Sequence, residues 1–222
     1  MNFGQWERKS IERPIRIAAQ LLVEGRTPEI FFRELVQQVG LGDRIDVRTF
    51  GDIAKDTLQT YLELFSSKAA FKERVTRLAI IRDAEGKQAE SGFQSICVAL
   101  LGAKLPVPSA MAAFTELPLQ VGVYVLPDCS RVGMLETLCL EAAAECEMAS
   151  PAKLLLCVDQ FLDCVTRSQP PFENPTKARF AAYALARGVV DPQLGRAAQK
   201  RIIPFDSQAF EKLIRFLKRL GD

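Results

Sequence analysis

The sequence contains no histidine, and this absence excludes more chemistry than any other feature of its composition. Ser-His-Asp and Cys-His catalysis, imidazole-ligated zinc and histidine acid–base chemistry all need that side chain. The six cysteines form no Cys-x-x-Cys pair and no zinc-ribbon spacing. Carboxylate oxygens therefore remain as the main candidates for metal binding or acid–base catalysis.

Signals for export or membrane insertion are also lacking. The first 14 residues are polar and charged, unlike a signal peptide, and no apolar stretch approaches the roughly 18 residues that a membrane helix needs. These features predict a cytoplasmic protein in a reducing environment, with no membrane partner.

A strong net charge is missing as well. The net charge is only +2, which gives no overall attraction to nucleic acid or membranes. The distribution is uneven, because residues 1–150 carry 17 basic and 20 acidic side chains and residues 151–222 carry 12 basic and 7 acidic ones. This arrangement suits a metal-assisted reaction on an anionic substrate, and it equally suits a solvated basic helical surface.

Two apolar runs end in carboxylates. Residues 17–23 lead into Glu24, and residues 78–81 lead into Asp83 and Glu85. Continuous apolar runs of this length are typical of buried strands in a parallel sheet, and the carboxyl ends of such strands form the ligand-binding crevice. Carboxylates gathered there would repel one another, and a divalent cation would relieve that repulsion.

Strand and helix patterns alternate through the first two thirds of the chain. Residues 45–50 resemble a short strand, and residues 120–128 resemble a strand that again ends in an acid, Asp128. The helix expected after it carries Glu136 in its first turns. The pattern predicts an α/β fold, with a mainly parallel four-stranded sheet flanked by helices over residues 1–149 and a helical extension over residues 150–222.

Two local details of these helices are predicted. Thr27 is expected to be the N-cap of the helix that follows Glu24, with Pro28 in its first turn. In the extension, an apolar stripe is expected to pack against the sheet domain. The stripe consists of Leu154, Leu155, Val158, Phe161 and Leu162.

The order of these signatures resembles a known domain. Leu22-Val23-Glu24-Gly25, followed by a helix and later by a strand ending in Asp83-Ala84-Glu85, resembles the Toprim domain of topoisomerases, primases and overcoming-lysogenisation-defect nucleases. Later segments look more narrowly like an uncharacterised bacterial Toprim-like family. These are Leu126-Pro127-Asp128, the segment from Gly133 to Glu141, Ala197-Ala198, Pro204-Phe205-Asp206 and Phe210.

The resemblance implies a site that binds Mg²⁺, with Mn²⁺ as the alternative, at the strand ends. Glu24 matches the Toprim glutamate that serves as a ligand or general acid–base group, and Asp83 and Glu85 match the Asp-x-Asp metal pair, here Asp-x-Glu. The acid that follows the first glycine in many relatives falls at Pro28, with Glu29 one position later.

Other charged residues complete the predicted site. Asp128 and Glu136 are candidates for a second metal position, with Lys153 and Lys177 as candidates for binding substrate phosphate. Two such ions could activate water and stabilise the leaving oxygen.

Two functions from different classes follow. One is a Mg²⁺-dependent nuclease or phosphoryl-transfer enzyme acting on nucleic acid, and the intact acids favour it. The other is a non-catalytic regulatory or interaction protein on the same scaffold, favoured by the low net charge and the lack of aromatic-basic clusters. The chain has no Walker A motif, so an ATPase partner would be a separate protein. The oligomeric state stays open, a homo-oligomer included.

Overall fold

A four-stranded parallel sheet forms the centre of the protein. The computed structural model describes residues 10–50, 57–84, 86, 88–148 and 153–222. The strands are β1 (Ala19–Glu24), β2 (Ile45–Phe50), β3 (Arg77–Asp83) and β4 (Gln120–Leu126), and their order in the sheet is β2-β1-β3-β4. All three neighbouring pairs are parallel. The predicted α/β fold is therefore confirmed.

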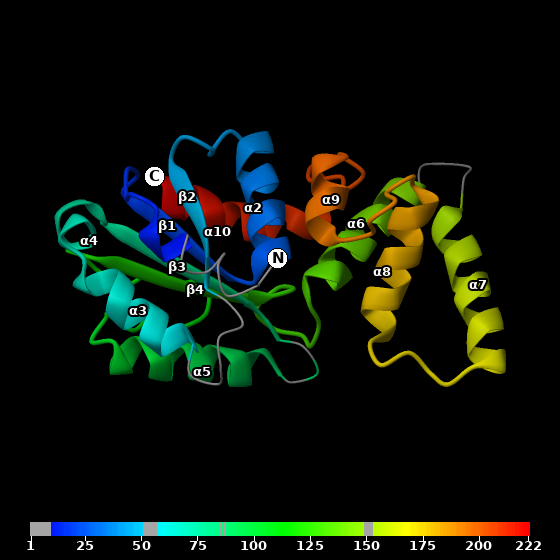
Figure 1. Cartoon of the computed structure of the whole chain (residues 1–222), viewed down its shortest axis with the longest axis horizontal. Coiled ribbons are helices and arrows are strands. Elements are labelled where there is room, and N and C mark those ends of the chain that lie inside the picture. Colours follow the sequence, from blue (N-terminus) through cyan, green and yellow to red (C-terminus); the bar gives the residue numbers. More distant parts are fainter. Residues whose placement is uncertain (1–9, 51–56, 85, 87, 149–152) are drawn as a thin grey trace.

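Helices cover both faces of the sheet (Figure 1). One face packs against α2 (Arg26–Gln38) and α10 (Glu211–Gly221), and the other against α3 (Thr57–Ser67), α4 (Ala69–Arg74) and α5 (Ala89–Gly102). Because side chains alternate along a strand, Leu21 and Val23 enter the first core and Leu22 enters the second. Burial on both faces explains the continuous apolar runs in the sequence.

The helical extension is continuous with the first of these two cores. Helices α6 (Leu135–Met148), α7 (Leu154–Ser168) and α8 (Pro175–Ala186) lie together at one end of the molecule in Figure 1. The chain then returns through α9 (Leu194–Gln199), which packs on α2, and a short 3₁₀ helix, η1 (Gln208–Phe210), into α10. On the sheet, Phe216 of α10 stacks against Phe114 with ring centroids 5.0 Å apart.

One sequence-based expectation about these helices is wrong, and another holds only in part. Helix α2 begins at Arg26 with Gly25 as its N-cap, and the hydroxyl of Thr27 instead donates to Gln193 Oε1 at 3.1 Å. In α7, Leu155 and Val158 are buried as expected, but Phe161 is exposed. Leu154 and Leu162 are partly buried against the same core, and α7 contacts α8 and α6, so the stripe packs as expected except at Phe161.

Candidate functional site at the carboxyl edge of the sheet

The strand order creates one topological switch point. The chain leaves β1 towards β2 on one side, and β3 lies on the other side of β1. Glu24 is the last residue of β1 and Asp83 is the last residue of β3, so both lie at the carboxyl edge of neighbouring strands. Asp128 follows the end of β4 at the same edge. Open parallel sheets bind their ligands at such a point, because the loops diverge there and leave a crevice.

A glycine turns the chain immediately after Glu24. Gly25 has φ 88°, a left-handed conformation that residues with a Cβ adopt only with strain. Its N–H donates to Phe50 O of the neighbouring strand at 3.0 Å, and its own carbonyl accepts from Glu29 N at 3.2 Å. The turn therefore holds the start of α2 directly beside the Glu24 carboxylate.

Glu24 forms an ion pair with an arginine from β3. The Nε of Arg82 lies 2.8 Å from Glu24 Oε2, and both side chains are partly exposed. The register pairs Val23 with Ile81, which brings Glu24 beside Arg82 on one face of the sheet, whereas Asp83 follows on the opposite face. An arginine between the two strand ends thus offsets the negative charge at this edge.

Asp83 caps a helix that is distant in the sequence. Its Oδ1 accepts a hydrogen bond from the backbone N–H of Leu135, the first residue of α6, at 2.9 Å. A carboxylate is favourable there, because the first backbone N–H groups of a helix lack partners within the helix and carry a partial positive charge. Asp83 therefore links the edge of the sheet to α6.

Glu136, the second residue of α6, lies in the same neighbourhood. Its side chain is buried, and burial raises its pKa, although its own backbone N–H and the charge of Lys177 partly oppose that effect. Cys139 follows one turn later. Burial raises the pKa of its thiol, and the charges of Glu136 and Asp83 add to this effect. Asp83 and Glu136 are thus brought together at the start of α6.

Asp128 is held by its own loop. Its Oδ1 accepts from the backbone N–H groups of Ser130 and Arg131, both at 3.1 Å, and from the Ser130 hydroxyl at 2.7 Å. Its Oδ2 pairs with Arg131 Nε at 2.7 Å, and Arg131 also contacts Glu141. Burial would raise the pKa of Asp128, but these hydrogen bonds from Ser130 and Arg131 lower it to about 2. The acid therefore stabilises the turn after β4.

A metal site at this edge would rest on few protein ligands. Within the described part of the chain, no three Asp, Glu, Cys or His side chains are grouped so as to hold a metal ion. Glu85 lies outside the described residues. The hard oxygens of Glu24 and Asp83 still suit Mg²⁺, which is commonly bound by one or two carboxylates together with waters and substrate phosphate.

The two predicted phosphate-binding lysines lie in different surroundings. Lys153 donates from Nζ to the backbone carbonyl of Glu147 at 2.9 Å, between the end of α6 and the start of α7. Lys177 lies in the first turn of α8, and its charge acts on Glu136. Of the pair, Lys177 is the one associated with the carboxylates.

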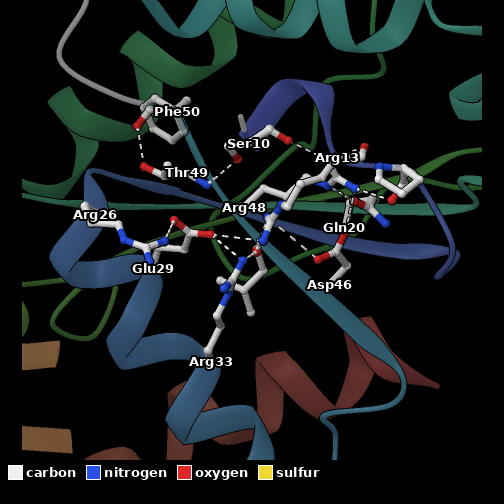
Figure 2. Close-up of polar contacts among 12 residues, drawn as sticks. Ser10, Arg13, Gln20, Arg26, Glu29, Arg33, Asp46, Arg48, Thr49 and Phe50 are labelled. Atoms are coloured by element: carbon white, nitrogen blue, oxygen red, sulfur yellow. Dashed lines mark hydrogen bonds and ion pairs between the residues drawn. The ribbon is translucent and has the colours of Figure 1, made fainter. Parts of the chain in front are cut away.

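Sequence reasoning missed a cluster of arginines around a buried acid. Glu29 on α2 has a side chain that is only 2% exposed, and Figure 2 shows Arg13, Arg26 and Arg33 around it. Nitrogens of these arginines lie 3.3, 2.8 and 2.6 Å from its carboxylate oxygens, respectively. The spacing Arg26, Glu29, Arg33 along one helix was a usable signal, because residues three and four apart share a helix face.

A pocket elsewhere in the protein does not involve these acids. It has a volume of ≈ 350 Å³ and lies between α6, α7, α8 and the segment after α9. Tyr183 and Arg187 line it, whereas none of the acids predicted to bind metal does. The carboxyl edge and this pocket are thus separate features.

The fold and its edge define a class, a doubly wound α/β protein with carboxylates at the switch point. The chain belongs to the family described as "Protein of unknown function (DUF3226)", whose family model matches residues 18–222. The search of curated proteins found no match, and neither did the search of solved structures. Among the helices that the structure describes, none has the length and apolar character to cross a membrane.

Proposed function

We propose that this protein is a Mg²⁺-dependent nuclease, or a related phosphoryl-transfer enzyme, that acts on nucleic acid at the carboxyl edge of its sheet. The observation that carries the proposal is the position of Glu24 and Asp83 on the neighbouring strands that flank the switch point. Although the two side chains leave opposite faces of the sheet, Mg²⁺ needs only one or two protein carboxylates and takes its other ligands from waters and substrate phosphate.

The protein residues at this edge have distinct roles in the proposed reaction. Asp83 is fixed by the N–H of Leu135 and offers oxygen to the cation. Glu24 is a ligand or takes a proton from the attacking water, and Arg82, which pairs with Glu24, can turn its guanidinium to a phosphate oxygen when substrate enters. Mg²⁺ or Mn²⁺ would lower the pKa of a bound water and neutralise charge on the phosphoryl group.

A second candidate function is a non-catalytic regulatory or interaction protein on the same scaffold. A specific observation favours it: Glu24, Asp83 and Asp128 each already have a partner within the protein. Such contacts stabilise the edge without a cation, as a binding scaffold would require. A separate ATPase or other protein would then supply any chemistry.

The test uses the full chain and replaces one acid by its amide. Asp83→Asn removes the charge but keeps an oxygen that can accept from Leu135 N, so the helix cap survives. Asp163→Asn, at an exposed position on α7, is the matched control. Melting temperature is measured with and without Mg²⁺ or Mn²⁺, and cleavage is assayed on single- and double-stranded DNA and RNA.

We expect the cation to raise the melting temperature of the wild type and of the control but not of Asp83→Asn. A ligand that binds only the folded state stabilises it by about 2.7 kcal/mol at 100 times its dissociation constant. Cleavage should be lost in Asp83→Asn and in Glu24→Gln. An equal metal effect in Asp83→Asn would rule out the site. Metal stabilisation without cleavage of any nucleic acid would favour the regulatory scaffold.

A further inference from the structure

Two arginines line the pocket between α6, α7, α8 and the segment after α9. Arg187 directly follows the last residue of α8, and Arg201 lies two residues beyond the end of α9. Within the part of the chain that the structure describes, neither guanidinium forms an ion pair or a side-chain hydrogen bond. Both residues are exposed, so each guanidinium keeps its five N–H donors for solvent or for a ligand.

Glu147 is the one acid among the described residues that line this pocket. Its two carboxylate oxygens accept from the backbone N–H of Leu155, at 3.3 and 3.0 Å, and so satisfy a free donor at the start of α7. Two guanidinium charges and one carboxylate charge therefore line the pocket, and the carboxylate is already held by hydrogen bonds. The resulting positive charge favours an anionic ligand.

Tyr183 on α8 adds a hydroxyl group to the pocket. This residue is only 5% exposed, and its hydroxyl forms no hydrogen bond with another described residue. Burial raises the pKa of Tyr183, although the charge of Arg187 opposes that effect, so the hydroxyl keeps its proton at neutral pH. Polar groups that are largely removed from water need partners. An oxyanion bound in the pocket would accept a hydrogen bond from this hydroxyl.

The backbone of Arg201 has an unfavourable conformation. The N–H of Arg201 donates to Ala198 O at 2.9 Å, and the N–H of Ile202 donates to Ala197 O at 3.2 Å. This pair of hydrogen bonds ends many helices, and glycine usually occupies the left-handed position within it. Here that position has φ 55° and is an arginine, which costs stability that a glycine would not. A binding role for the side chain would explain the cost.

The rest of the described lining is mainly apolar. Ala143, Leu154, Ile202 and Pro204 contribute to it, together with the ring of Tyr183. The volume of ≈ 350 Å³ equals that of about 12 water molecules at about 30 Å³ each. Sites for small molecules typically have about 300–1,000 Å³. The pocket therefore suits a small ligand, of about a dozen non-hydrogen atoms, that has an apolar body.

We propose that this pocket binds a small organic anion. Its carboxylate or phosphate group is bound by Arg187 and Arg201, and its apolar body lies against the apolar lining. Guanidinium groups suit both kinds of anion, because they can donate two parallel hydrogen bonds to carboxylate or phosphate oxygens. The hydroxyl of Tyr183 donates to the same anionic group.

This site and the carboxyl edge of the sheet are separated along α6. Asp83 accepts from the N–H of Leu135, the first residue of the helix, whereas Glu147 in the pocket lies 12 residues further along. At 1.5 Å per residue this separation is about 18 Å. A ligand in the pocket would not occupy the position proposed for the cation, so the two proposals can succeed or fail separately.

Isothermal titration calorimetry of the full chain, in Tris chloride without divalent cations, tests the proposal. The probes are 2-naphthoate, 2-naphthyl phosphate and neutral 2-naphthamide, which share one apolar body, and inorganic phosphate, which has none. We expect at least one naphthyl anion to bind at least about tenfold more tightly than 2-naphthamide and than inorganic phosphate, because charge-assisted hydrogen bonds and apolar burial both contribute. The tighter of the two anions identifies the head group.

Three substitutions assign the binding to this pocket. Arg187→Gln should weaken binding of the tighter anion at least about tenfold and leave binding of 2-naphthamide unchanged. Arg201→Gly should also weaken anion binding, while raising the melting temperature by about 2 °C because glycine adopts φ 55° without strain. Tyr183→Phe removes only the hydroxyl, and should weaken anion binding about threefold or more without lowering the melting temperature.

A purely structural role for Arg201 would not give opposite effects on binding and on stability. Arg167→Gln, at an exposed arginine near the end of α7, is the matched control and should bind as the wild type does. Asp83→Asn should also bind the anion normally, whatever it does to cation binding and cleavage.

Three results would overturn the proposal. They are no binding of either naphthyl anion by the wild type, equal affinity for the naphthyl anions and 2-naphthamide, and equal affinity of Arg187→Gln and Arg167→Gln for the tighter anion. Weaker anion binding in Arg187→Gln and Arg201→Gly alone, with the melting temperature raised in Arg201→Gly, would support it. That support would stand even if the protein cleaved no nucleic acid.

Discussion

Glu136, at the start of α6, is a buried acid whose surroundings disfavour its charged form. Glu136 is 8% exposed, and burial raises its pKa, with its own backbone N–H and Lys177 only partly opposing that effect. Groups whose pKa is perturbed by burial occur at functional sites more often than elsewhere. Its neighbour Asp83 is the acid that caps the same helix. The cost in stability at this position is what a functional role would explain.

Replacing this acid by its amide should therefore stabilise the protein at neutral pH. The folded-state pKa of Glu136 is raised above its unfolded value, so the ionised side chain costs stability above that pKa, and the cost disappears as the pH falls through it. Glu136→Gln should raise the melting temperature at pH 7, and the gain should shrink towards pH 4.5. Thermal unfolding across this range measures it.

Glu173→Gln is the control, because this acid is exposed in the loop before α8 and should show no such pH-dependent gain. A lower melting temperature for Glu136→Gln at pH 7 would contradict the expectation. It would show that the attraction of Lys177 outweighs the cost of burial.

Which acids would lie together could be predicted only in part. Parallel strands carry their last residues to one edge, so the sequence was sufficient to place Glu24, Asp83 and Asp128 there. Their partners were not predictable. Pairing of Glu24 with Arg82 depends on the strand register, and capping of Leu135 by Asp83 depends on contacts between residues 52 positions apart.

The segment before β1 is attached to the edge strand β2 through a buried arginine. The fully buried Arg48 donates to Gln20 Oε1 at 2.7 Å and to the backbone carbonyls of Ser10 and Pro14 at 2.7 and 3.0 Å. Ser10 in turn accepts from the N–H of Thr49 at 3.2 Å. Unpaired groups on an edge strand invite association with other strands, and this segment satisfies several of them.

Removing the guanidinium should detach this segment. Arg48→Met leaves Asp46 without its closest cation and several carbonyls without donors, which should cost about 3 kcal/mol. Hydrogen exchange at Thr49 should rise sharply. Arg44→Met is the control, since Arg44 is exposed and its ion pair within the described residues is with exposed Asp222, so it should cost below about 1 kcal/mol. Equal losses from both substitutions would contradict this account.

The length of each helix or strand determined whether its sequence pattern predicted it. The four strands and the long helices have repeating apolar patterns that can be recognised without the fold. The six-residue helices α4 and α9 escaped notice, because two turns contain too few positions to show a period. Helix α9 depends on tertiary contact: a Cβ on its Gly195 would lie 2.8 Å from Ile30 Cβ, so only a glycine allows this approach to α2.

At the scale of the whole molecule, the sheet and the C-terminal helix share one core. The sequence placed a boundary at residue 149, where alternation of strands and helices gives way to helices alone. Leu213, Phe216, Leu217 and Leu220 of α10 are all buried in the core that includes β1 and β4. The last residues of the chain therefore complete the covering of a sheet whose last strand ends at Leu126. No local sequence pattern predicts that α10 packs back against the sheet.

A chain that ends at Asp206 should consequently lose its native fold, although it retains every strand. Without η1 and α10, one sheet face would expose its apolar side chains, and the expected product is aggregated or a molten globule. Two substitutions in the full chain test the same contribution of α10 to stability. Phe216→Ala should cost about 3–5 kcal/mol, whereas Phe161→Ala, at a side chain that is 58% exposed, should cost less than about 0.5 kcal/mol. Denaturant unfolding measures both. Cooperative unfolding of the shortened chain as a monomer would show that η1 and α10 are dispensable for the fold.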